Sequence, residues 1–129
     1  MGKYLLDTDV VIEWLRRDDT IVAWLKERDS RGDFLACTPV TIAEVYAGLR
    51  PSEEFIIGDV LRVLHCVPID ERVGRKAGHY RRRFGRSHGV EIADALIAGA
   101  AHVHGLTLCS RNLRHYPMRD VRKQTPKAG

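Results

Sequence analysis

The sequence predicts a single α/β domain in which a parallel sheet of four to five strands is flanked by helices on both faces. Short apolar runs, typical of strands, alternate with longer segments whose apolar residues recur at helical spacing. A strand–helix–strand connection places neighbouring strands parallel to each other. No repeat, low-complexity segment or long linker divides the chain. We therefore expect one domain over residues 1–129, with a core at 1–124 and a frayed tail at 125–129.

The strands are predicted from apolar runs, and the helices from the segments between them. The expected strands are Lys3–Leu6, Phe34–Cys37, 66–69 and 106–109, with 118–121 as a last edge strand. The expected helices are 10–15, 20–25, 41–48, 51–64, 70–85 and 91–104. The helix at 41–48 begins with Thr41-x-x-Glu44, which has capping-box spacing, and its expected buried residues are Ile42, Val45, Tyr46 and Leu49.

Composition excludes several classes of protein. Hydrophobic residues make up 44% and charged residues 29% of the chain, which are ordinary values for a globular domain. No apolar run approaches the roughly 20 residues of a membrane span, and an acid at position 7 is too early for a signal peptide, so we expect a cytoplasmic protein. The net charge of +4 is compatible with a polyanionic partner. The three cysteines are expected to be buried, reduced thiols: Cys37, Cys66 and Cys109.

Three acids stand near the starts of different predicted helices. Asp7 directly follows the first strand, and ligands bind at the carboxyl ends of parallel strands. Asp94 is the single charged residue of segment 92–101, where a carboxylate is costly unless it is paired, hydrogen-bonded or bound to a metal. It could equally complement the positive end of the helix dipole. Glu44 is explained either by the capping box or by a place among small residues that leave room for an ion.

The three acids are more informative together than singly. Clustered carboxylates repel one another, and cations neutralise them. Oxygen-only ligands suit Mg²⁺, with Mn²⁺ as a substitute, and such ions assist phosphate hydrolysis. We therefore predict that Asp7, Glu44 and Asp94 are catalytic and metal-binding residues. Asp9 is expected to be the helix cap or a supporting residue.

Four segments resemble the PIN-domain family, and specifically the VapC-type toxin ribonucleases of type II toxin–antitoxin systems. They are 5–11, 41–49, 92–98 and 108–116, and the resemblance spans nearly the whole chain.

The resemblance implies a Mg²⁺-dependent ribonuclease that hydrolyses RNA phosphodiester bonds. Asp7 and Asp94 match the aspartates that hold the metal, and Glu44 matches the acid that binds it directly or through water. Ser110 and Asn112 match the polar pair that supports the metal site and the first aspartate. Many members of the family carry a fourth acid near Asn112, which this sequence lacks.

The resemblance also implies partners. Members are usually homodimers that a small VapB-type antitoxin holds inactive, and they reach operator DNA only through that antitoxin. Arg111 and Arg114 adjoin the predicted site and are candidate RNA contacts. The run Arg81-Arg82-Arg83 is either a further RNA contact or a solvated face that complements the C-terminus of its helix.

Two other functions remain open at this stage. Asp7-Thr8-Asp9 fits the opening motif of haloacid-dehalogenase phosphatases, in which the first aspartate is the nucleophile and the second the acid and base. Thr38 and Lys76 could stand in for later motifs, but Glu44 would have no role. The other alternative is a PIN-type module that binds RNA or protein without cutting it.

Overall fold

The computed structural model describes residues 1–127, which form five parallel strands and six α-helices. The strand order is β3-β2-β1-β4-β5, so β1 lies in the middle of the sheet. The elements are β1 (Lys3–Leu6), α1 (Thr8–Leu15), α2 (Asp19–Ser30), β2 (Phe34–Cys37), α3 (Pro39–Ala47), the 3-10 turn η1 (Pro51–Glu53), α4 (Ile57–Arg62), β3 (His65–Cys66), α5 (Glu71–His88), α6 (Ile92–His104), β4 (Thr107–Cys109), the 3-10 turn η2 (Leu113–His115) and β5 (Lys123–Gln124). The predicted fold class is confirmed.

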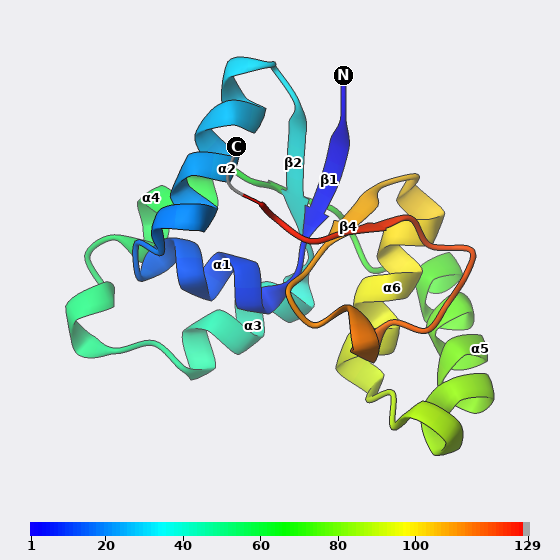
Figure 1. Cartoon of the computed structure of the whole chain (residues 1–129). Coiled ribbons are helices and arrows are strands. Elements are labelled where there is room, and N and C mark those ends of the chain that lie inside the picture. Colours follow the sequence, from blue (N-terminus) through cyan, green and yellow to red (C-terminus); the bar gives the residue numbers. More distant parts are fainter. Residues whose placement is uncertain (128–129) are drawn as a thin grey trace.

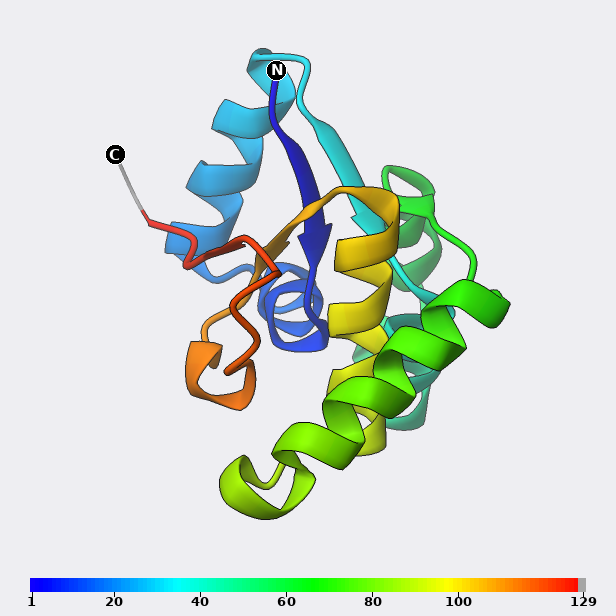
Figure 2. The same ribbon diagram turned by 90° about the vertical axis from the view of Figure 1, so that its right-hand side faces the viewer.

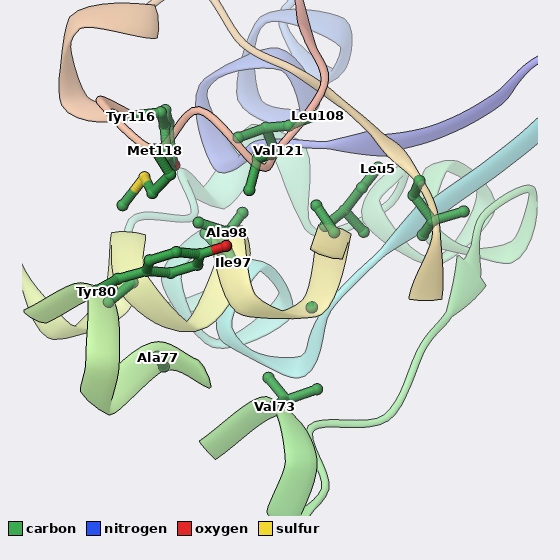
Figure 3. Close-up of a cluster of buried hydrophobic side chains, with 14 of the residues drawn as sticks. Leu5, Val73, Ala77, Tyr80, Ile97, Ala98, Leu108, Tyr116, Met118 and Val121 are labelled. Carbon is green, nitrogen blue, oxygen red and sulfur yellow. The ribbon is translucent and has the colours of Figure 1, made fainter. Parts of the chain in front are cut away.

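Helices cover both faces of the sheet, as Figure 1 shows, with α1–α4 on one side and α5 and α6 on the other. Successive strand residues point to opposite faces, so Leu5 packs in the core below α6 whereas Leu6 packs in the core below α1. On the second side α6 lies between the sheet and α5, and the side chains of this core are drawn in Figure 3.

The close packing of α5 on α6 depends on Gly99. A Cβ atom at this position would lie 3.1 Å from the carbonyl oxygen of Val73 and 3.3 Å from the backbone nitrogen of Ala77. Both atoms belong to the backbone of α5 and cannot move aside. Glycine therefore lets the two helices approach closely, which holds the first turn of α6 beside the sheet.

Several predicted boundaries are wrong, for identifiable reasons. The helix α5 does not end at Gly85 but continues to His88 and ends at Gly89, whose φ of 64° is the left-handed conformation that favours glycine. Segment 51–64 is not one helix, because η1 and a turn precede α4. The last strand lies at Lys123–Gln124 rather than at 118–121, because Met118 and Val121 turn inward to the core beside α5 and α6.

Two burial predictions are also wrong. Tyr46 is 51% exposed, although the spacing of apolar residues in α3 placed it inside. Cys66 is exposed, whereas Cys37 and Cys109 are buried as predicted. Within the predicted tail, Pro126 is buried, and residues 128 and 129 lie outside the described part of the chain. Over residues 1–127, no helix has the length and apolar character that crossing a membrane requires.

Candidate active site

Polar side chains from distant parts of the chain meet where the central strands end. Asp7 follows β1 and Ser110 follows β4, and these strands pair in parallel with Leu6 opposite Cys109. Asp94 lies in the first turn of α6. Figure 2 looks along α1 and shows its start directly beyond the end of β1, with α6 alongside. The fold therefore gathers these residues at one edge of the sheet, as the strand order requires.

Asp7 is held in one orientation by two hydrogen bonds. Its Oδ1 accepts from the backbone N–H of Thr8 at 2.8 Å, and its Oδ2 accepts from the hydroxyl of Ser110 at 2.8 Å. Ser110 is fully buried and in turn accepts from the backbone N–H of Asn112 at 2.9 Å. Asp7 is thus the N-cap of α1, so of the two roles predicted for Asp9 the structure excludes the cap and leaves the supporting residue. Capping leaves the remaining lone pairs of Asp7 to serve another ligand.

Asp94 lies in the electrostatic field of the other two predicted acids. Burial raises the pKa of this carboxyl above its usual value, and the negative charges of Asp7 and, less strongly, Glu44 raise it further. His115 and the hydroxyl of Tyr116 act in the opposite direction. The hydroxyl of Tyr116 donates to Oδ1 of Asp94 at 3.4 Å, and Nδ1 of His115 lies 3.8 Å from Oδ2. The three acids are therefore neighbours.

Glu44 is exposed on α3 and has no capping role. Thr38 caps this helix by accepting from the backbone N–H of Thr41 at 3.3 Å, so the predicted capping box is wrong. Oε1 of Glu44 instead accepts from the hydroxyl of Thr8 at 2.6 Å, and that hydroxyl also lies 3.1 Å from the hydroxyl of Thr41. A capping box therefore does not explain Glu44, and its carboxylate is directed toward the start of α1.

Asp9 ties α1 to the segment after β4. Its Oδ2 accepts from the backbone N–H of Arg111 at 3.0 Å and from the side-chain amide of Asn112 at 3.2 Å. Burial, and then the charge of Asp7, raise the pKa of Asp9 to about 6. Asn112 thus contacts the second aspartate of the segment, and it supports Asp7 only through Ser110.

The two arginines predicted to contact RNA differ in their surroundings. The guanidinium of Arg111 is 2.9 Å from Glu13 and 3.0 Å from Asp18, so this cation is paired within the domain. Arg114 is exposed at the edge of the site, in η2.

Two site residues were missed by the sequence analysis. Thr8 orients Glu44, and Tyr116 is 1% exposed with its hydroxyl between the carboxylates of Asp7 and Asp94. Burial, and then the charges of these two acids, raise the pKa of Tyr116, so its proton stays available for donation. Both residues lie inside segments singled out by the resemblance. No role was predicted for Thr8 or Tyr116 from the sequence, because a single hydroxyl residue forms no recognisable spacing pattern with other residues.

The donor set suits a hard divalent cation. It consists of carboxylate oxygens, and an ion would relieve the repulsion that, after burial, raises the pKa of Asp94. Within residues 1–127, no three His, Cys, Asp or Glu side chains stand close enough together to form a complete ligand set. The residues therefore fit a cation by their chemistry, with Asp7 and Asp94 as the acids fixed in place.

Known proteins share this fold and these segments. The family model of the PIN domain matches residues 4–121. The chain is 36% identical to Ribonuclease VapC10 of Mycobacterium tuberculosis over 115 residues, which are 88% of this chain and 86% of that protein. It is 30% identical to Ribonuclease VapC19 of the same organism, over 88% of this chain and 92% of that one.

Solved structures give the same result for the fold. The crystal structure of VapBC2 from Rickettsia felis, bound to a DNA fragment from its promoter, superposes with a TM-score of 0.83 and 17% identity, over 95% of this chain and 98% of that chain. The two chains therefore share the same fold. This chain belongs to the PIN-domain family.

Proposed function

We propose that this chain is a Mg²⁺-dependent ribonuclease and the toxin of a toxin–antitoxin pair. The observation that carries the proposal is the convergence of Asp7, which precedes α1, with Asp94 of α6 and Glu44 of α3. Burial, and then the charges of Asp7 and Glu44, raise the pKa of Asp94. Curated relatives at 36% and 30% identity, each over 88% of this chain, are named ribonucleases.

The residues have distinct tasks in this proposal. Asp7 and Asp94 would hold the ion directly, and Glu44 would hold it directly or through water. A bound Mg²⁺ supplies charge that offsets the negative phosphate and activates water for attack. Ser110 fixes the rotamer of Asp7, and Thr8 fixes that of Glu44. Tyr116 donates toward Asp94 and keeps that side of the site closed to bulk water.

Cleavage of structured RNA tests the proposal. Wild type and the variants Asp7→Asn and Asp94→Asn are incubated with RNA in Mg²⁺, in Mn²⁺ and in chelator. We expect cleavage by wild type with either ion, and a loss of at least about a hundredfold in both variants, since each removes a charge at the reacting centre. Undiminished cleavage in both variants would refute the site.

A matched control distinguishes an effect on the proposed metal site from the general effect of removing one negative charge from the protein. Asp59→Asn makes the same change on α4, where the side chain is 75% exposed and lies 3.6 Å from Arg62. This variant should cleave RNA like wild type. Calorimetric titration with Mg²⁺ gives a second readout, because Asp7→Asn and Asp94→Asn should weaken binding of the ion whether or not the RNA is cut.

The partners follow from the same relatives. We propose a homodimer that a VapB-type antitoxin inhibits and that contacts operator DNA through the antitoxin. The VapBC2 structure from Rickettsia felis, which is bound to a DNA fragment from its promoter and shares the fold of this chain, supports this proposal. Co-expression with the protein encoded by the adjacent reading frame should give a stable complex with suppressed ribonuclease activity. RNA binding without cleavage in Mg²⁺ would instead favour the module that binds and does not cut.

A phosphatase of the haloacid-dehalogenase type is not supported. Both side-chain oxygens of Asp9 are engaged by backbone and amide N–H groups, which leaves this residue poorly placed as a mobile acid and base. Lys76 pairs with Asp120 at 2.7 Å and not with Asp7.

A further inference from the structure

A cavity between α5 and the segment 117–120 has no function assigned so far. It has a volume of about 680 Å³, within the range of about 300–1,000 Å³ that is usual for ligand sites. One wall is the C-terminal half of α5, with Arg83, Phe84 and His88, and the other is the segment 117–120, with Arg119.

The arginines on the first turns of α5 are neutralised within the helix. Arg72 lies 3.3 Å from Asp70, and Arg75 pairs with Glu71. Because both charges are paired with nearby acids, Arg72 and Arg75 serve as the control for unpaired arginines elsewhere.

Of the three lysine and arginine side chains that line the cavity, one is neutralised by an acid and two are not. Lys76 pairs with Asp120 at 2.7 Å, and the hydroxyl of Tyr80 donates to the same carboxylate at 2.7 Å, which anchors segment 117–120 against α5. Throughout residues 1–127, Arg83 and Arg119 have no carboxylate partner. Asp120 therefore neutralises Lys76, and the positive charges of Arg83 and Arg119 remain uncompensated at the cavity.

An aromatic ring accompanies these charges. The guanidinium of Arg83 lies 5.4 Å from the centroid of the Phe84 ring, and Phe84 itself is half-buried and lines the cavity. Arginines beside an aromatic ring are the combination that binds single-stranded nucleic acid, since the cations take the phosphates and the ring stacks on a base.

One wall of the cavity begins one residue after a side chain that contacts the proposed catalytic acids. Tyr116 donates to Asp94, and the next two residues along the chain, Pro117 and Met118, line the cavity. A strand of RNA whose phosphate reaches Asp94 would therefore have its neighbouring nucleotide at this cavity.

We infer that this cavity binds a nucleotide of single-stranded RNA next to the bond that is cut, with Arg83 and Arg119 on its phosphates and Phe84 against its base. This inference rests on the proposed ribonuclease function, because it names where the substrate lies. Arg83 and Arg119 are then positioning residues rather than catalytic ones.

Salt-dependent RNA binding tests the inference. Affinity for a short fluorescein-labelled single-stranded RNA of mixed sequence is measured by anisotropy at several salt concentrations, in an Asp94→Asn background that prevents cleavage. The double variant Arg83→Ala/Arg119→Ala should lower the slope of log affinity against log salt by about 1.4, since each phosphate contact on a single strand contributes about 0.7. Affinity at moderate salt should fall roughly tenfold.

The matched control is Arg72→Ala/Arg75→Ala, which removes the same number of charges at two paired positions of α5. In this control, the slope of log affinity against log salt should change by less than half of the change seen in Arg83→Ala/Arg119→Ala. The double variant Arg83→Lys/Arg119→Lys keeps both charges and should retain most of the slope. Both arginines are exposed, so thermal melting should show folded protein in every case.

Three results would overturn the inference. They are an unchanged slope in Arg83→Ala/Arg119→Ala, an equal loss in the Arg72/Arg75 control, and an equal loss of affinity for a DNA duplex of the same sequence. Failure of the proposed function is distinguishable, because it appears as absent cleavage in wild type whatever the arginine variants do. Cleavage by wild type with an unchanged slope would reject this inference alone.

Discussion

Replacing Ser110 by alanine should destabilise the protein and its active site together. The hydroxyl donates to Oδ2 of Asp7 at 2.8 Å and accepts from the N–H of Asn112 at 2.9 Å, in a fully buried position. A hydrogen bond to a charged group contributes about 1.5–3 kcal/mol, and a neutral one about 0.5–1.5 kcal/mol. Asp7 is 6% exposed, so water cannot replace the lost donor easily. We expect Ser110→Ala to lower the free energy of unfolding by about 2–4 kcal/mol.

Urea denaturation followed by circular dichroism measures this loss. Ser110→Cys is the matched control, because it fills the same space with a weaker donor, and it should fall between alanine and wild type. If the proposed function holds, Mg²⁺ affinity should fall about 10–100-fold in Ser110→Ala, since a group that orients a metal ligand is lost. A change in unfolding free energy below about 0.5 kcal/mol, the level of a neutral surface substitution, would refute the reasoning.

Three further predictions concern other parts of the structure. The pKa of Asp9 is raised to about 6, so the folded state binds this proton more tightly than the unfolded state; metal-free protein should lose stability as pH rises from about 4 to 6, and Asp9→Asn should flatten that part of a melting profile. Ile97 is 1% exposed, and Ile97→Ala should lower the free energy of unfolding in urea by about 2–5 kcal/mol. Ile92 is 55% exposed on the same helix, and Ile92→Ala should lower it by less than about 0.5 kcal/mol. Equal losses in the two variants would contradict the packing. Iodoacetamide should alkylate only the exposed Cys66 of the folded protein, because burial raises the pKa of Cys37 to about 12 and also that of Cys109; a second adduct in the intact mass before unfolding would contradict the burial.

The helix and strand pattern was largely predictable because it depends on local sequence. β1 and β2 begin and end as predicted, and α5 begins one residue after its predicted start. The errors arose where packing overrides a local pattern. A glycine often ends a helix, so the helix was predicted to end at Gly85. The helix instead continues past Gly85 and ends at Gly89, which has the left-handed backbone conformation.

The acids were predictable, but what holds them was not. Asp94 stood out because its helix is otherwise apolar, and the structure places it beside Asp7 and Glu44. Glu44 had a local explanation in the capping box, which the true cap at Thr38 removes. Thr8 carried no pattern of its own, since its role depends on meeting Glu44 from another helix.

By itself, the sequence determined the alternation of strands and helices, and hence the parallel sheet whose carboxyl edge carries Asp7. Periodicity and capping act over a few residues, so they are visible in the chain as written. Only the tertiary structure decided that Ser110 fixes Asp7 and that Arg83 and Arg119 share a cavity beside Tyr116. These contacts join residues far apart in sequence, and their geometry follows from how the helices pack on the sheet.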